Sequence, residues 1–253
     1  MNIDNATTPS APDATASIPA VVLAGGLGTR LRSVVADRPK VLADVGGRPF
    51  LTYLLDFLAR HGFRRAVICT GYMAGAVRAA LGETYRGVAL DYSEETVPLG
   101  TGGALRLALP LVDSPRVFVM NGDSYCDADA RAFVRSCAAE TDSPAGDLVV
   151  VRQNDTGRFG RVLFDDRGRV TAFEEKGRSA GPGWINAGLY LLSRPLLESI
   201  PAGRAVSLER EVFPAWAGRG LVAWPTDGAF IDIGDPASYA AAEAFFKAKE
   251  EHG

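Results

Sequence analysis

A glycine-rich stretch near the start of the chain has the residues needed to bind a polyphosphate. The sequence Val21-Val22-Leu23-Ala24-Gly25-Gly26-Leu27-Gly28-Thr29-Arg30-Leu31 is an apolar run that passes directly into glycines and ends in a threonine and an arginine. Glycines let the backbone approach a phosphate closely, and an arginine adds a forked, charged hydrogen-bond donor. The stretch carries neither the Walker lysine nor the third glycine of the dinucleotide fingerprint. It therefore predicts a different kind of triphosphate site, with nucleotide-binding residues Leu23, Ala24, Gly25, Gly26, Gly28 and Thr29.

Two charged residues further along the chain could work with this loop. Lys40 follows Pro39, which stiffens the chain, and lies ten residues beyond Arg30. Asp123 ends the apolar run Val117-Phe118-Val119-Met120-Asn121-Gly122-Asp123. Ligands of open α/β sheets gather at the carboxyl ends of strands, although an isolated aspartate there also fits a simple turn.

Together, Gly-Gly-x-Gly-Thr-Arg-Leu and the following Pro-Lys resemble the signature of the sugar-1-phosphate nucleotidylyltransferases, also called sugar-nucleotide pyrophosphorylases. The resemblance covers about residues 20–240. It implies that Arg30 contacts the departing pyrophosphate and that Lys40 binds the α-phosphate and the sugar phosphate. Arg30, Lys40 and Asp123 are the expected catalytic residues, and the substrates are an NTP and a sugar 1-phosphate.

The same resemblance implies a magnesium site. Its aspartates are Asp123, with Gly122 beside it on the nucleotide, and Asp232 from Phe230-Ile231-Asp232-Ile233-Gly234-Asp235-Pro236. Two carboxylates completed by phosphate oxygens and water suit the octahedral preference of Mg²⁺.

The sugar pocket is expected from three further motifs. The resemblance assigns Gly160 of Arg158-Phe159-Gly160 to the sugar, Glu175 to its hydroxyls, Lys176 to the 1-phosphate and Asn186 to the pocket lining. Standing alone, Glu175 and Lys176 would fit an exposed ion pair equally well.

The choice of base depends on Glu95. Glu94-Glu95-Thr96-Val97-Pro98-Leu99-Gly100-Thr101-Gly102-Gly103-Ala104 resembles the family segment beside the base, so Glu95, Gly100 and Thr101 are expected nucleotide ligands. Relatives that select uracil or thymine commonly have a glutamine five residues before this glycine. A carboxylate can accept N1–H and N2–H₂ of guanine but would repel the O2 and O4 acceptors of uracil. We therefore expect GTP.

The short layout resembles most closely the D-glycero-α-D-manno-heptose 1-phosphate guanylyltransferases of bacterial surface-polysaccharide pathways. Mannose-1-phosphate guanylyltransferases usually carry a C-terminal repeat domain, which the sequence lacks. That activity stays an alternative, as does uridylyl or thymidylyl transfer to glucose 1-phosphate. A non-catalytic nucleotide-sensing subunit is a third reading, but such proteins typically lose the arginine, the lysine or a metal aspartate, all of which are present here.

The elements that must position these residues alternate. Short β-branched runs and amphipathic segments predict an α/β fold, a doubly wound, mostly parallel mixed sheet of Rossmann-like type. Expected strands are Ala20–Leu23, Arg65–Cys69, Ala89–Tyr92, Arg116–Met120 and Asp147–Val151; expected helices are Phe50–His61, Ala74–Leu81, Gly102–Leu109 and Ala128–Ala139. After about residue 152, a small antiparallel extension should hold a hairpin of Arg161–Phe164 and Val170–Glu174 and strands Gly183–Leu192 and Phe230–Ile233, before a final helix Ala237–Lys249.

Composition limits the remaining possibilities. The 253 residues suit one domain over residues 18–253, and 27 basic against 30 acidic residues give a net charge of −3, which argues against a nucleic-acid partner. No apolar run is long enough for a membrane span. Residues 1–17 are expected to be a disordered tail without signal-peptide features, which favours the cytoplasm. A homodimer is a further possibility.

Overall fold

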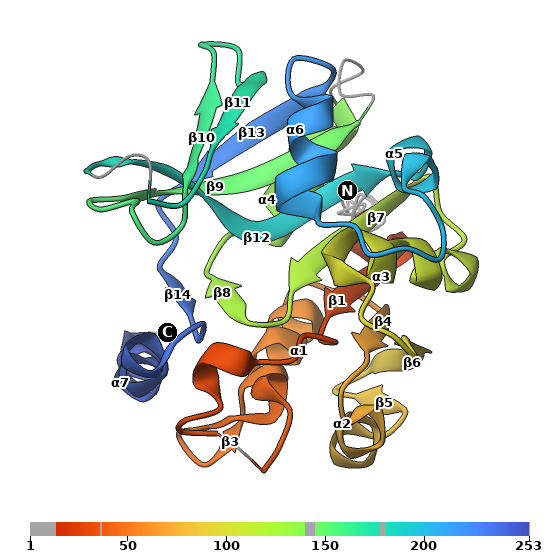
Figure 1. The fold of residues 1–253 in the computed structure, drawn as a ribbon, viewed down its shortest axis with the longest axis vertical. Helices are drawn as coiled ribbons and strands as arrows, with labels where there is room; N and C mark the ends of the chain where they lie inside the picture. Colours follow the sequence, from red (N-terminus) through yellow and green to blue (C-terminus); the bar gives the residue numbers. More distant parts are fainter. Residues whose placement is uncertain (1–13, 36, 140–144, 178–180, 253) are drawn as a thin grey trace, which may run out of the picture.

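The apolar runs of the chain form one eight-stranded sheet in a computed structural model that describes residues 14–35, 37–139, 145–177 and 181–252. Its strands are β1 (Ala20–Leu23), β4 (Arg65–Thr70), β5 (Thr84–Tyr85), β6 (Val88–Glu94), β7 (Arg116–Asn121), β9 (Gly146–Gln153), β12 (Gly183–Ser193) and β13 (Leu221–Thr226). Three small antiparallel pairs accompany it, namely β2 (Asp44–Val45) with β3 (Arg48–Pro49), β8 (Ser124–Cys126) with β14 (Phe230–Asp232), and β10 (Arg161–Phe164) with β11 (Val170–Glu174). The α-helices are α1 (Phe50–Arg60), α2 (Ala74–Leu81), α3 (Gly100–Ala108), α4 (Ala130–Ala139), α5 (Arg194–Ser199), α6 (Phe213–Trp216) and α7 (Pro236–His252) (Figure 1).

The strand order places a topological switch point at β1. The order is β13-β9-β12-β7-β1-β4-β6-β5, so the chain moves outward from β1 through β4 to β6 and then returns to the other side of β1 as β7. Strands β1, β4, β6 and β7 are parallel, whereas β12 runs antiparallel to both of its neighbours. Ligand crevices of open α/β sheets form at such a switch point, at the carboxyl ends of the strands. Here those ends are Leu23 and Asn121, which are paired in register.

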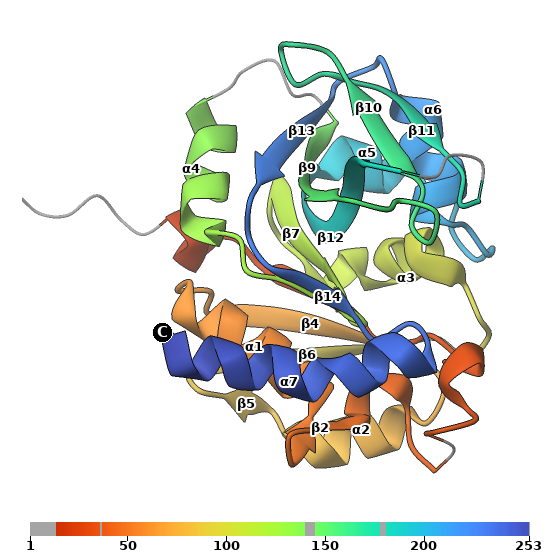
Figure 2. The same ribbon diagram turned by 90° about the vertical axis from the view of Figure 1, so that its left-hand side faces the viewer.

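Side chains of alternating strand residues fill two cores. Val22, Ile68 and Met120 belong to the core on one face, which includes buried residues of α1, α4 and α7. Val21 and Val119 belong to the core on the other face, with residues of α3 and α5. Figure 2 shows this layering, with α4 on one side of the strands and α3, α5 and α6 on the other. The crevice at the carboxyl ends of β1 and β7 is therefore supported by packed side chains on both faces of the sheet.

All of the predicted helices and strands are present. The bounds of Ala20–Leu23, Ala74–Leu81 and both hairpin strands are confirmed exactly as expected, and the ends of the other predicted elements lie within about three residues of their expected positions. The final helix begins as its sequence indicates, because Asp235 Oδ1 accepts the N–H groups of Ala237 (3.0 Å) and Ser238 (2.9 Å).

Three features differ from the expectation. Strand β12 lies within the main sheet between β9 and β7, and not in a separate extension. Strand β13 was not predicted, because Pro225 interrupts its apolar run; the proline is tolerated because β13 is an edge strand. The tail is shorter than expected, since Ala14–Ser17 form a 3-10 helix in which buried Thr15 donates a hydrogen bond to the carbonyl of His61 (2.6 Å). Residues 1–13 of the predicted tail lie outside the described residues.

None of the helices in the described part of the chain is both long and apolar enough to cross a membrane.

Candidate active site

The floor of the site is a close main-chain contact at the carboxyl ends of the parallel strands β1 and β7. The N–H of Gly122 donates to the carbonyl of Leu23 over 2.9 Å, and a Cβ at Gly122 would overlap that carbonyl oxygen. Only glycine allows this approach. It brings Asp123, the residue after Gly122, directly beside the glycine-rich loop.

A cavity of about 190 Å³ opens above this floor. It is lined by Gly26, Gly28, Thr29, Arg30, Lys40, Asp123 and Gly234. All three predicted catalytic residues and three of the predicted phosphate-loop residues therefore face the same space. The contribution of Gly234 comes from the far end of the sequence, next to the predicted metal ligand Asp232.

The glycine-rich loop is shaped by two different glycines. Gly28 has a left-handed backbone (φ +58°), and a Cβ there would lie 2.9 Å from Cβ of Lys40. At Gly26, by contrast, a Cβ would meet no atom within 4 Å. The loop therefore packs on Lys40 with one glycine and leaves its main chain open at the other, as a phosphate-binding loop requires.

Lys40 and Asp123 form an ion pair in the cavity. Lys40 Nζ donates to Asp123 Oδ2 over 2.7 Å, and the lysine side chain is 11% exposed whereas that of Asp123 is 43% exposed. The cation is thus held below the opening, with the carboxylate above it. An incoming phosphate could contact this ammonium group and compete with Asp123 for it.

Asp232 approaches Asp123 from the neighbouring strand. In the β8–β14 pair Asp232 lies opposite Ser124, and the N–H of Ile233 donates to the carbonyl of Asp123 (2.9 Å). Asp232 Oδ2 accepts the N–H of Gly234 (3.0 Å). A Cβ on Gly234 would overlap Asp232 Oδ2 and lie 3.6 Å from Arg30 Nη2, so this glycine separates the carboxylate from the arginine.

Asp123 and Asp232 are suited to a magnesium ion that takes few of its ligands from the protein. Among the described residues, no group of three or more histidine, cysteine or acidic side chains is placed to bind a metal. A pair of carboxylates, one in the turn between β7 and β8 and one at the end of β14, matches an ion that takes its other ligands from substrate phosphates and water, which is the usual binding mode of Mg²⁺.

Glu95 lies against the main chain of the glycine-rich loop. A Cβ at Gly25 would be 2.9 Å from Glu95 Oε1, and one at Gly71 would be 2.8 Å from the same oxygen. Glu95 Oε2 accepts the N–H of Leu99 (3.0 Å). Burial raises the pKa of the Glu95 carboxyl, and the Leu99 hydrogen bond opposes this shift. The neighbouring Glu94 is exposed, so the two glutamates occupy different environments.

The Gly100-Thr101 segment is occupied by contacts within the protein. Thr101 Oγ1 accepts the N–H of Leu208 (2.8 Å) and donates to Glu209 (3.1 Å). Gly100 has φ +68°, and a Cβ there would lie 2.6 Å from the carbonyl oxygen of Val206. The glycine is thus explained by packing against residues 206–209, a contact that sequence reasoning missed. That Gly100 and Thr101 bind nucleotide stays a prediction.

Three of the four predicted sugar residues, Gly160, Glu175 and Lys176, lie near the end of β11. Gly160 has φ +78°, and a Cβ there would overlap the carbonyl oxygen of Glu174, the last residue of β11. The next two residues, Glu175 and Lys176, have exposed side chains. Their assigned contacts with a sugar phosphate are sterically open.

Asn186 is held by its own strand. Its Nδ2 donates to the hydroxyl of Tyr190 (2.7 Å), and its Oδ1 accepts the N–H of Gly188 (2.9 Å), where the register of β12 against β9 is irregular. Tyr190 is fully buried, and burial raises the pKa of its hydroxyl. Asn121 lies near this group, since a Cβ at Gly188 would be 3.0 Å from that of Asn121. Sequence reasoning missed Tyr190 and Asn121, although Asn121 directly precedes the Gly122-Asp123 pair.

Arg158 is a further residue whose contacts the sequence did not reveal. It forms ion pairs with Asp232 (3.2 Å) and with Asp235 (2.6 Å). The only sequence signal was its position two residues before Gly160. Arg158 thus connects the predicted sugar loop to a predicted metal ligand.

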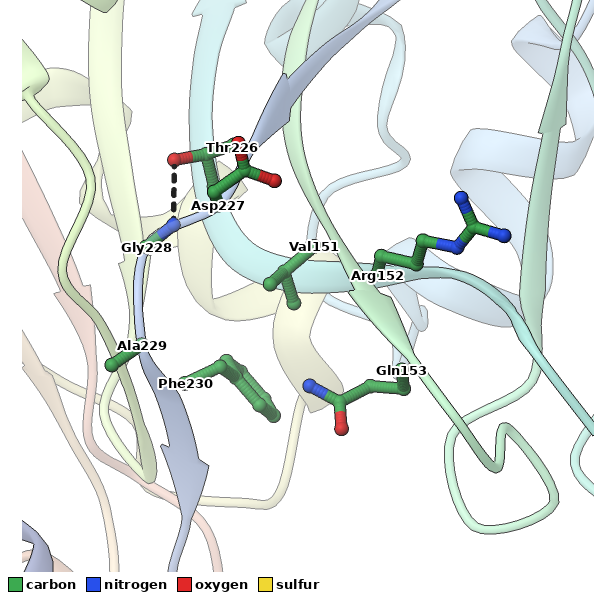
Figure 3. Close-up of a pocket in the computed structure, with 8 residues that line it drawn as sticks. All are labelled: Val151, Arg152, Gln153, Thr226, Asp227, Gly228, Ala229 and Phe230. Carbon is green, nitrogen blue, oxygen red and sulfur yellow. Dashed lines mark hydrogen bonds between the residues drawn. The ribbon is translucent and has the colours of Figure 1, made fainter.

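A second cavity, of about 270 Å³, is lined by the ends of β9 and β13, the segment after β13 and the start of β14. Its lining residues are Val151, Arg152, Gln153, Thr226, Asp227, Gly228, Ala229 and Phe230. Figure 3 shows the amide of Gln153 directed toward Phe230, while Arg152 points away. The cavity therefore separates the start of the Arg158 loop from the segment that leads to Asp232.

Comparisons with known proteins identify relatives that match nearly the whole chain. Residues 19–249 match the family described as Nucleotidyl transferase. The chain is 34% identical over 226 residues to D-glycero-alpha-D-manno-heptose 1-phosphate guanylyltransferase of Aneurinibacillus thermoaerophilus, a match that covers 88% of this chain and 96% of that protein. It is 39% identical over 206 residues to mannose-1-phosphate guanylyltransferase of Mycobacterium tuberculosis, covering 80% of this chain and 56% of the relative. The crystal structure of HddC from Yersinia pseudotuberculosis complexed with GMP-PN superposes with a TM-score of 0.78 at 34% identity, covering 90% of this chain and 99% of HddC.

Proposed function

The chain belongs to the nucleotidyl transferase family, and from that premise we propose that it transfers GMP from GTP to D-glycero-α-D-manno-heptose 1-phosphate, releasing pyrophosphate. The acceptor is proposed from two relatives whose names give this activity, and the chain covers 96% of each of them. The structural observation that carries the reaction type is the meeting of Arg30, Lys40 and Asp123 around one cavity at the glycine-rich loop.

The reaction exchanges one phosphoanhydride bond for another. An oxygen of the sugar 1-phosphate attacks the α-phosphorus of GTP, and the bond from that phosphorus to the bridging oxygen of the β-phosphate breaks. The attacking phosphate is already ionised at neutral pH, so the protein need not supply a general base. Its task is to align two mutually repelling anions and to stabilise the charge on the α-phosphate.

The residues of the cavity suit this task. Lys40 is held below the opening, where its ammonium group can neutralise the α-phosphate and the sugar phosphate. Arg30 is exposed at the cavity and can follow the leaving pyrophosphate. The open main chain at Gly26 lets N–H groups of the loop donate to the phosphates.

Asp123 and Asp232 are the residues that would hold Mg²⁺. The ion would supply positive charge to the phosphates and so lower the repulsion between the substrates.

The position of Glu95 supports guanine as the base. Its carboxylate lies beside Gly25 at the start of the phosphate loop, and Oε1 lies near the main chain of Gly25 and Gly71. We propose that the carboxylate accepts N1–H and N2–H₂ of guanine.

Because GTP is the proposed donor, we expect the reaction to take place in the cytoplasm.

A second acceptor, mannose 1-phosphate, is favoured by the 39% identity to a mannose-1-phosphate guanylyltransferase. The chain spans 56% of that relative.

The acceptor can be tested by pyrophosphate release from GTP and Mg²⁺ with heptose, mannose or glucose 1-phosphate. We expect the highest kcat/KM with the heptose, and a fall of orders of magnitude in kcat for Lys40→Ala. A preference for mannose 1-phosphate would replace the acceptor but not the chemistry. Equal rates in Lys40→Ala and the unmodified protein would contradict the assignment of the site.

A further inference from the structure

Arg158 is a positively charged residue at the predicted metal site. Neither the sequence motifs nor the proposed reaction gives it a role. It lies on the chain between β9 and β10, and its guanidinium reaches the turn between β14 and α7, where it pairs with Asp232 at 3.2 Å and Asp235 at 2.6 Å. Its own loop also supports it, because the guanidinium lies 5.2 Å from the centre of the Phe159 ring. The side chain is 51% exposed, so solvent and ions can reach it.

The two carboxylates that Arg158 contacts differ in the other hydrogen bonds that they accept. Asp235 uses Oδ1 to cap the first turn of α7 and Oδ2 to bind Arg158, so it is fixed by the fold. Asp232 uses Oδ2 to accept the N–H of Gly234 and Oδ1 to bind Arg158. Asp235 is therefore a permanent anchor for the arginine, whereas Asp232 is an acid that we have assigned to a metal.

Both acids proposed for the metal carry a cation in this structure. Asp123 is paired with Lys40, and Asp232 is paired with Arg158. A carboxylate oxygen that binds a divalent ion loses much of its attraction for a guanidinium, because the ion and the arginine repel each other. The ion and Arg158 must therefore compete for Asp232.

The surroundings of Arg158 allow such a change of partner. The cavity of about 270 Å³ lies between Gln153, at the start of the Arg158 loop, and the segment Thr226–Phe230 (Figure 3). Beyond the cavity, Phe159 contacts Phe230 edge to face with 5.6 Å between the ring centres. The loop is thus not packed along its whole length against the segment that carries Asp232, and the Arg158 ion pairs form the link at the site itself.

We propose that Arg158 is a placeholder cation, which neutralises Asp232 until a divalent ion arrives and then keeps only its bond to Asp235. The inference rests on the proposed function, since it takes Asp232 as a metal ligand. It makes Arg158 a positioning residue that connects metal binding with the loop carrying Gly160. The sugar side of the site would then respond to the loading of the nucleotide side.

The direct test is Mn²⁺ binding to the substrate-free protein, measured from the electron paramagnetic resonance signal of the free ion. Arg158→Gln should bind Mn²⁺ about three- to tenfold more tightly than the unmodified protein, a change equivalent to about 0.6–1.4 kcal/mol. Arg158→Lys should return toward the unmodified affinity. Arg152→Gln is the matched control, because Arg152 is an exposed arginine that lies six residues before Arg158 and points away from Phe230. This substitution should leave Mn²⁺ affinity unchanged.

Asp232→Asn separates this inference from the proposed function. If Asp232→Asn leaves Mn²⁺ binding intact, the metal site itself is assigned wrongly and the placeholder role falls with it. If Asp232→Asn abolishes binding but Arg158→Gln binds no tighter than the unmodified protein, the metal site stands and the placeholder role is overturned. An equal gain in Arg152→Gln would reduce the effect to general surface charge and would also overturn it.

Discussion

Glu95 is the residue on which the proposed choice of nucleotide depends. Its carboxylate has one oxygen on the N–H of Leu99 and the other beside the glycines of the loop. Sequence reasoning identified this residue from its spacing to Gly100, but the packing that fixes it depends on Gly71, which no motif indicated. The position is therefore specified by main-chain contacts from three segments, and such contacts leave no side-chain pattern to read.

Glu95→Gln should lower kcat/KM for GTP at least tenfold, while that for UTP or dTTP falls less or rises. A hydrogen bond to a charged group contributes about 1.5–3 kcal/mol, and an amide can still accept from Leu99. Steady-state rates with each nucleotide give the comparison. Glu94→Gln is the control, since Glu94 is exposed. A shift of base preference in Glu94→Gln alone would show that the neighbouring residue reads the base.

The pH dependence of GTP binding should report the same carboxyl. Burial raises the pKa of Glu95, so the group takes up a proton at a higher pH than an ordinary glutamate. Protonation removes the acceptor for guanine, and KM for GTP should therefore rise as pH falls through this raised pKa. The rise should be absent in Glu95→Gln. A KM profile that is the same in both proteins would show that Glu95 does not contact the base.

The elements bring the site together where strands end. The close contact between the ends of β1 and β7 was indicated by glycines that follow two apolar runs. For this reason the sequence placed the phosphate loop and Asp123 correctly at the ends of these strands. Contacts between α3 and residues 206–209 could not be foreseen, since they consist mainly of main-chain hydrogen bonds. Strand β13 was not predicted because it contains Pro225, and a proline would break an inner strand. The proline is tolerated because β13 lies at the edge of the sheet.

Two glycine substitutions should separate folding from ligand approach. Gly122→Ala places a methyl group against the carbonyl of Leu23 and should destabilise the protein by about 1–3 kcal/mol. Gly26→Ala meets no atom within 4 Å and should change stability by less than about 0.5 kcal/mol, yet weaken GTP binding by obstructing the loop. Denaturant unfolding and GTP titration measure the two effects. Normal GTP affinity in Gly26→Ala would argue against phosphate binding at this loop.

Thr101→Val should act on stability before it acts on nucleotide binding. Leu208 is fully buried, and its N–H would lose the threonine hydroxyl as acceptor, at a cost of about 1–3 kcal/mol. Thr96→Val, at an exposed position in the same segment, should be neutral. Thermal unfolding compares the two variants. An unchanged melting temperature together with a higher KM for GTP would show that the hydroxyl serves the nucleotide, as the sequence pattern predicted.

At the scale of the whole molecule, the site joins residues from Gly26 to Gly234 at the carboxyl ends of β1 and β7. The doubly wound class followed from alternating apolar segments, and the paired aspartates followed from a resemblance rather than from spacing. What the sequence could not supply was the pairing of each metal acid with a cation, since Arg158 and Asp232 lie 74 positions apart. That pairing connects the loop of Gly160, which is predicted to contact the sugar, with Asp232, which is predicted to bind the metal.

The most direct test of the account is a competition in which the protein chooses its own nucleotide. An equimolar mixture of GTP, ATP, UTP and dTTP is supplied with D-glycero-α-D-manno-heptose 1-phosphate and Mg²⁺, and the nucleotide-sugar products are quantified by mass spectrometry. We expect the GDP-sugar to exceed each of the other products at least tenfold, and its formation to stop when Mg²⁺ is chelated. A predominance of the UDP- or dTDP-sugar, or no nucleotide-sugar from the folded protein, would contradict guanylyl transfer at this site.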